Sequence, residues 1–166
     1  MTSIFGYDTK GGSSIASNTG AYKCLFTMPE DGTVTKLTVR VKNEQSYAKN
    51  MDTGIYNGTA KVVNLIISVP ASYDDWIDAD IADTALAAGT YGLAFKCKGI
   101  GVMNVYYTAG TTSQLQGDTG LSSADNLPDP FGIDVNYDIK LSMYATYTPT
   151  PPSGIQKYTL INEYDY

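Results

Sequence analysis

The absence of histidine sets the first limit on the chemistry available to this chain. None of its 166 residues is histidine, which removes serine and cysteine hydrolase triads, HExxH zinc sites and histidine acid–base catalysis. A pair of carboxylates could still hydrolyse a glycosidic bond if an apolar pocket raised the pKa of one acid. The acids here fall on expected turns and on the polar face of an expected strand. The sequence therefore predicts a protein that is not an enzyme.

Acidic residues gather between positions 74 and 83. Carboxylates on loops are ligands that Ca²⁺ prefers, although the spacing here is not that of an EF-hand. The alternative is a set of ordinary solvated acids. We expect no cofactor, and the candidate ligands of a structural calcium ion are Asp74, Asp75 and Asp78, with a second group at Asp125, Asp129 and Asp134.

Three aromatic residues, Trp76, Tyr106 and Tyr144, fall on the outward phase of their expected strands. Exposed aromatic rings with polar neighbours can stack on a sugar or contact another protein. The alternative is that a loop covers them, and the long connection at 109–136 is the obvious one. These three residues are the candidate ligand or interface site.

Two cysteines, Cys24 and Cys97, fall on the inward phase of expected strands. A disulfide between them would close a loop of roughly 70 residues and stabilise the fold by about 4 kcal/mol. The alternative is two buried free thiols, which is favoured if the chain stays in the cytoplasm. No charged stretch followed by an apolar one comes after Met1, so we expect synthesis in the cytoplasm without a signal peptide.

Period-two alternation of apolar and polar residues predicts an all-β protein. On one expected strand Tyr91, Leu93, Phe95 and Cys97 face inward, whereas Lys23 and Arg40 are placed on outward faces of others. About eight short strands with turns between them, such as Asn57-Gly58, favour an antiparallel β-sandwich of jelly-roll type with extended N- and C-terminal arms. Strands are expected at 21–28, 35–41, 61–69, 74–81, 89–98, 102–108 and 137–147, and the strand at 35–41 is the clearest.

The chain divides into an N-terminal arm (1–20), a sandwich (21–148), a spacer (149–154) and a tail (155–166). Three prolines stiffen the spacer and withhold backbone donors. The tail alternates like a strand and could add to the sheet edge of a neighbouring subunit. The alternative is a frayed or self-docked terminus. Its candidate assembly residues are Tyr158, Leu160, Ile161 and Tyr164.

Three stretches carry a resemblance to a known family: LAAGTYGLAF at 86–95, PDPFG at 128–132 and LSMYATY at 141–147. They resemble the "aGTYwLaf" strand, "PDPFG" loop and "lSiYAtYt" strand of a jelly-roll family common in tailed-phage and in thermophile or environmental sequences. The resemblance covers most of 22–148 and implies no catalytic residue. It implies an architecture similar to phage decoration and fibre domains and to carbohydrate-binding modules. The acidic stretch at 68–83 departs from the family pattern.

The expected function is that of a non-catalytic structural protein of a virion surface, a capsid decoration or fibre protein whose terminal arms dock on neighbouring subunits. A carbohydrate-binding module is the alternative, and an extracellular filament subunit is a further one. Expected partners are other protein subunits, in a homo-oligomer or with capsid or fibre proteins, and a glycan under the alternative. The net charge of -6 argues against binding to nucleic acid or to an anionic membrane.

Overall fold

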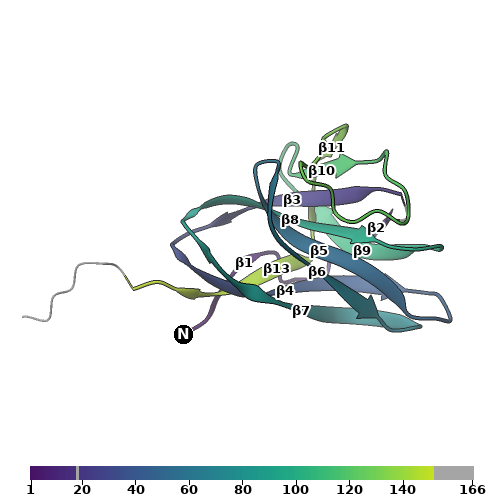
Figure 1. Ribbon diagram of the computed structural model, residues 1–166, viewed down its shortest axis with the longest axis horizontal. Helices are drawn as coiled ribbons and strands as arrows, with labels where there is room; N and C mark the ends of the chain where they lie inside the picture. Colours follow the sequence, from purple (N-terminus) through teal and green to yellow (C-terminus); the bar gives the residue numbers. More distant parts are fainter. Residues whose placement is uncertain (18, 152–166) are drawn as a thin grey trace, which may run out of the picture.

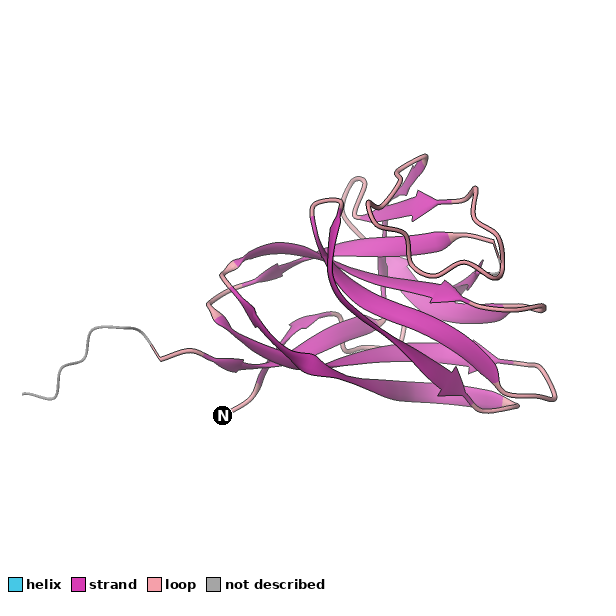
Figure 2. Cartoon of the chain, in the orientation of Figure 1, coloured by secondary structure: helices cyan, strands magenta, loops and turns pink. Residues whose placement is uncertain are grey.

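The computed structural model describes residues 1–17 and 19–151, which form two antiparallel sheets packed as a β-sandwich (Figures 1 and 2). These residues contain no helix, and hence none that could cross a membrane. The seven-stranded sheet consists of β1 (Ser3–Gly6), β2 (Ser13–Ser17), β4 (Gly32–Asn43), β7 (Tyr73–Leu86), β9 (Met103–Ala109), β12 (Ile139–Leu141) and β13 (Met143–Pro149). The six-stranded sheet has the order β11 (Val135–Tyr137), β10 (Leu115–Asp118), β3 (Ala21–Met28), β8 (Gly89–Cys97), β5 (Lys49–Asn57) and β6 (Ala60–Val69).

Strand β4 organises the seven-stranded sheet. It pairs with β7 along its whole length, and on its other side with β13 and then β9. The registers place Arg40 opposite Trp76, and Thr38 opposite both Asp78 and Tyr144. Side chains from β7, β4 and β13 thus share one face of the sheet.

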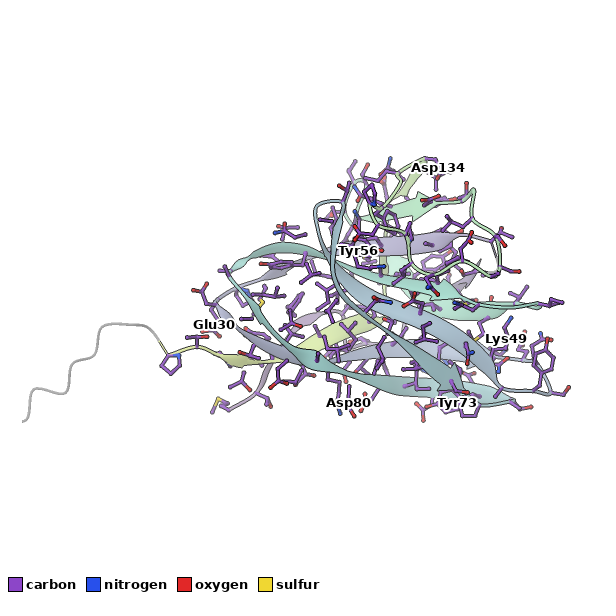
Figure 3. All side chains as sticks on the ribbon, viewed as in Figure 1. Glu30, Lys49, Tyr56, Tyr73, Asp80 and Asp134 are labelled. Atoms are coloured by element: carbon purple, nitrogen blue, oxygen red, sulfur yellow. The ribbon has the colours of Figure 1, made fainter. Side chains whose placement is uncertain are left out.

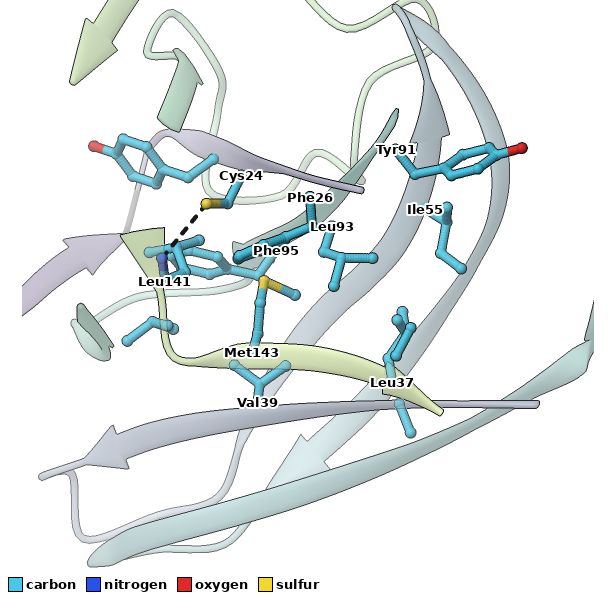
Figure 4. Close-up of a cluster of buried hydrophobic side chains, with 14 of the residues drawn as sticks. Cys24, Phe26, Leu37, Val39, Ile55, Tyr91, Leu93, Phe95, Leu141 and Met143 are labelled. Atoms are coloured by element: carbon cyan, nitrogen blue, oxygen red, sulfur yellow. Dashed lines mark hydrogen bonds between the residues drawn. The ribbon is translucent and has the colours of Figure 1, made fainter. Parts of the chain in front are cut away.

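The core lies between the sheets and is built from the inward phase of the alternating strands (Figure 4). Tyr91, Leu93, Phe95 and Cys97 are all buried, as the alternation predicted. The same alternation is confirmed on β3 and β4, where apolar side chains of one phase enter the core. The all-β, antiparallel sandwich class is therefore confirmed.

Some boundaries differ from the sequence expectation. The connection expected at 109–136 contains β10 and the start of β11, and these two strands extend the six-stranded sheet beyond β3. Near the start of the chain, β1 pairs with β13 and β2 pairs with β9, so Phe5 enters the core. At the other end β13 continues to Pro149. The candidate assembly residues Tyr158, Leu160, Ile161 and Tyr164 lie outside the described residues.

The two cysteines are free and buried, which corrects the disulfide hypothesis in favour of its alternative. Cys24 lies opposite Leu93 in the pairing of β3 with β8, so Cys97 is four residues further along β8. That offset is about 13 Å of strand, whereas a disulfide needs Cα atoms within about 7 Å. Burial raises the pKa of each thiol to about 12.

We expect neither thiol to react with a disulfide reagent such as DTNB in the folded protein near neutral pH, because the thiolate is the reactive form. In denaturant, both thiols should react at once. The thionitrobenzoate released in each state measures the number of accessible thiols. A native protein that released a full equivalent without unfolding would contradict the buried positions.

Candidate functional site

Three aromatic residues and two charged residues form a continuous cluster on the outer face of the seven-stranded sheet. We call Arg40, Asp74, Trp76, Tyr106 and Tyr144 the outer aromatic patch. Their strands β4, β7, β9 and β13 are joined by direct pairing, and neighbours of the opposite phase enter the core. The structure therefore brings together all three aromatic residues that the sequence placed on outward phases.

Trp76 and Tyr144 make direct ring contact across β4. Their centroids lie 5.6 Å apart with the planes inclined by 56°, within the range of favourable aromatic pairs. Both side chains are half-buried. Part of each side chain therefore faces solvent, and the contact between the two rings holds them in position.

Tyr106 is engaged by charged groups on its ring and on its hydroxyl. The Lys10 ammonium lies 4.4 Å and the Arg40 guanidinium 5.1 Å from the ring centroid, as in cation–π pairs. The hydroxyl donates to Asp74 Oδ1 at 3.1 Å, and Arg40 Nη2 contacts the same oxygen at 2.8 Å. These cations occupy a face of the Tyr106 ring, so we expect Tyr106 to contribute polar contacts. The aromatic surface available for stacking comes from Trp76 and Tyr144.

Polar groups beside Trp76 extend the patch along β7. Asp78 accepts hydrogen bonds from Lys36 Nζ and Thr38 Oγ1, both at 2.8 Å. Burial alone would raise the pKa of Asp78, but these two hydrogen bonds and the Lys36 charge hold it below its usual value. Asp78 is thus a stable anion and hydrogen-bond acceptor next to the aromatic pair. Asp80 extends from β7 into solvent nearby (Figure 3).

The candidate calcium ligands contact protein groups. Asp74 pairs with Arg40, Asp75 accepts from the Trp76 backbone N–H, and Asp78 pairs with Lys36. In the second candidate group, Asp125 and Asp134 accept from nearby loop N–H groups and Asp129 accepts from the Lys61 N–H. Within the described part of the chain, no three acidic or cysteine side chains converge as a metal site would require.

The loop at 119–134 covers the six-stranded sheet and does not reach the patch. Leu127 and Phe131 pack with Tyr56 and Ala94 in a second, small apolar cluster, and the Phe131 N–H donates to Thr59 O at 2.8 Å. The loop lies so close to β5 that a Cβ at Gly54 would be 3.2 Å from Leu127 Cδ1. Figure 1 shows this green segment over β3 and β8. The proposed cover for the three aromatic residues therefore lies on the opposite side of the sandwich.

Beneath that loop lie charged side chains that sequence reasoning placed in solvent or did not identify. Lys23, expected on an outward face, is 1% exposed; its Nζ donates to Gly58 O at 2.7 Å and lies 4.6 Å from the Phe131 ring centroid. Asp52 and Lys96 face each other across β5 and β8 and are fully buried. Burial lowers the pKa of both lysines. On the other sheet Arg40, also expected outward, is only 7% exposed because the patch surrounds it.

Two surface pockets lie away from the patch. One, of about 320 Å³, is lined by residues that include Lys49, Lys98 and Ile100. The other, of about 410 Å³, is lined by residues that include Lys23, Asn57 and Gln116. Neither pocket is lined by a carboxylate, so neither supplies the acid pair that glycoside hydrolysis requires.

Comparisons with known proteins identify distant structural likenesses. No family model and no curated protein matches the sequence. The clostridial cysteine protease Cwp84, solved after propeptide cleavage, superposes with a TM-score of 0.57 and 11% identity over 90% of this chain and 40% of the protease. A ruminal GH26 endo-β-1,4-mannanase superposes with a TM-score of 0.40 and 14% identity over 86% of this chain and 21% of the mannanase. This chain thus spans less than half of either protein; the first likeness supports the fold alone, and the second supports no argument.

Proposed function

We propose that the protein is a non-catalytic recognition module that binds carbohydrate through the outer aromatic patch. The single observation that carries this proposal is the contact of the half-exposed Trp76 and Tyr144 on the outer face of the seven-stranded sheet, flanked by Asp78 and Asp74. A sugar ring has an apolar C–H face that packs on an aromatic ring and hydroxyls at its edge that bond carboxylates. Both kinds of group lie side by side in the patch.

Replacing Trp76 with alanine should weaken glycan binding at least about tenfold, or about 1.4 kcal/mol, because the largest stacking surface is lost. Tyr144→Ala should weaken binding in the same direction, since Tyr144 supports the indole ring. A glycan array with wild-type protein selects the ligand, and isothermal titration calorimetry then compares the variants.

Tyr137→Ala is the matched control, because Tyr137 is an exposed tyrosine on the other sheet. It should bind as the wild type does. A blank array with wild-type protein, or unchanged affinity in Trp76→Ala, would contradict carbohydrate binding at the patch. A large loss of thermal stability in Trp76→Ala would instead make Trp76 a structural residue.

A second candidate function is assembly at a virion surface, in a capsid decoration or fibre protein, or in an extracellular filament. The resemblance of 86–95, 128–132 and 141–147 to a phage-associated jelly-roll family supports it. So does the stretch of β6 from 62 to 69, which has no charged residue and pairs, among the described strands, with β5 alone. Under this function the sandwich is of jelly-roll type and its terminal arms dock on neighbouring subunits. Neighbouring genes for capsid or tail proteins would favour this function, and genes for polysaccharide breakdown would favour the first.

A further inference from the structure

Two long edge strands, β6 and β7, lie next to each other at one side of the sandwich, and they differ in charge. β7 carries five aspartates along its length. β6 carries no charged residue from position 62 to position 69. Charged residues are a usual protection of edge strands against pairing with another chain. β7 has that protection and most of β6 lacks it.

The side chains of β6 leave apolar surface open on both faces. On the outer face Val62 is 40% and Ile66 43% exposed. The side chains of the other phase, Val63, Leu65 and Ile67, pack on the core yet are only partly buried. A strand added beside β6 would cover both rows and would bond the alternate N–H and C=O groups that point away from β5.

The loop at 119–134 already contacts the start of β6, so only the later residues of the strand are available for pairing. The Lys61 N–H donates to Asp129 Oδ1 at 3.2 Å, and Lys61 Nζ donates to Leu127 O at 3.0 Å. The loop at 119–134 thus protects the edge at position 61. Within the described residues, β6 pairs only with β5, so the eight residues from 62 to 69 are left for another strand.

We propose that this edge of β6 accepts residues 155–166 of a second copy of the chain as an antiparallel strand. The inference rests on the assembly function and is independent of carbohydrate binding. The segment has twelve residues, enough to pair with eight, and it contains apolar and tyrosine residues with no glycine or proline after Gly154. Such a composition favours a strand.

The charges of the segment favour the antiparallel direction. Lys157 lies near its start, and Glu163 and Asp165 lie near its end. Antiparallel pairing brings Lys157 toward the end of β6, near Asp75 in the first residues of β7 after Tyr73, and brings the two acids toward Lys61. A parallel strand would reverse this and place like charges together.

The position where the chain leaves the sandwich favours a second copy over the same copy. Pro149 pairs with Gly32, and Gly32 also pairs with Leu86 at the far end of β7. An antiparallel strand on β6 must enter near Val69, at the opposite end of β7. The part of β4 that pairs with β7 spans eleven residue steps, which makes that distance about 36 Å. The five residues of 150–154 span at most about 17 Å. The segment of the same copy therefore cannot enter at the required end.

The test compares self-association of the full chain with that of three variants by sedimentation equilibrium. Ile66→Lys introduces a charge on β6 at an exposed position, and a truncation after Gly154 removes the segment. Each should weaken association at least tenfold while the melting temperature stays within a few degrees. Ala82→Lys, the same charge at an exposed position of β7, is the matched control and should associate as the wild type does. A synthetic peptide of residues 155–166 should dissociate the wild-type assembly, and should protect 62–69 of the truncated chain from hydrogen exchange.

The contrary outcomes are separable. A wild-type chain that stays monomeric at all concentrations would overturn both the inference and the assembly function. Assembly that survives Ile66→Lys would overturn the inference alone. Assembly that is lost in Ile66→Lys but kept after truncation would show β6 pairing with β6 of another copy, and would overturn the assignment of the segment.

Discussion

Replacing Asp52 with alanine is expected to lower the free energy of unfolding by about 3–5 kcal/mol, the cost of breaking a buried charged group away from its partners. The Asp52 carboxylate accepts hydrogen bonds from the Leu127 N–H and from Asn64 Nδ2, both at 2.8 Å, and it faces Lys96 on β8. Its removal leaves a buried N–H without an acceptor and takes one of the nearby negative charges away from the buried Lys96. Asp52 is also a direct link between β5 and the loop, and the hydrogen bond from the Tyr56 hydroxyl to Pro128 O is another.

Urea denaturation followed by tryptophan fluorescence measures this loss. Asp80→Ala is the control, because Asp80 is an exposed acid on β7 and its loss should change stability by less than about 0.5 kcal/mol. Limited proteolysis gives a second measurement, in which the Asp52 variant should be cut faster within 119–134. An Asp52→Ala protein as stable as the Asp80 variant would contradict the anchoring role.

The Phe95→Ala variant is expected to be destabilised by about 3–5 kcal/mol as well, through a different cause, the cavity left by a large core side chain. Phe95 is fully buried on β8 and stacks on Tyr22 with ring centroids 5.7 Å apart. Figure 4 shows its ring between the sheets, near Leu141 and Met143. Since β8 is flanked by β3 and β5, the site has little freedom to collapse.

Phe95→Leu separates packing from hydrophobicity in the same denaturation experiment. It keeps much of the apolar volume and should be less destabilised than the alanine variant. The carbohydrate affinity of both folded variants should match that of the wild type, because Phe95 lies on the inner face of the other sheet. If Phe95→Ala unfolded at the same urea concentration as wild type, the assignment of this residue to the core would be wrong.

These two residues show what the sequence could and could not predict. Phe95 was found by alternation alone, because a strand with one face in the core repeats every two residues. Asp52 was missed because a polar residue on an outward phase normally indicates solvent, and the segment that covers it comes from positions 119–134. Local pattern carries no information about which distant loop covers a sheet. The small residues Gly54 and Ala94 on that face were the available signal of close packing.

The candidate site was likewise predictable in part. Alternation placed Trp76 and Tyr144 outward, but their contact depends on the register of β7 and β13 against β4. Register depends on the whole hydrophobic pattern and on the turns. The sequence could therefore identify these residues as outward-facing, but could not predict that they are in contact. The sequence also placed Arg40 on an outward face. Arg40 is buried by Tyr106 and Asp74, which come from other strands, and the pairing of those strands is not visible in the sequence.

The pairing of β1 with β13, which places Ser3 opposite Tyr147, has a consequence for synthesis of the chain. β4 has one neighbour, β7, soon after it in the sequence, but its other main neighbour is β13, the last strand of the sandwich. The ribosome must therefore release nearly the whole sandwich before the seven-stranded sheet can close. Such distant pairings slow folding to milliseconds or seconds. Until β13 emerges, residues 32–39 of β4 remain an open edge on the nascent chain, because β9 pairs only with residues 41–43 on that side.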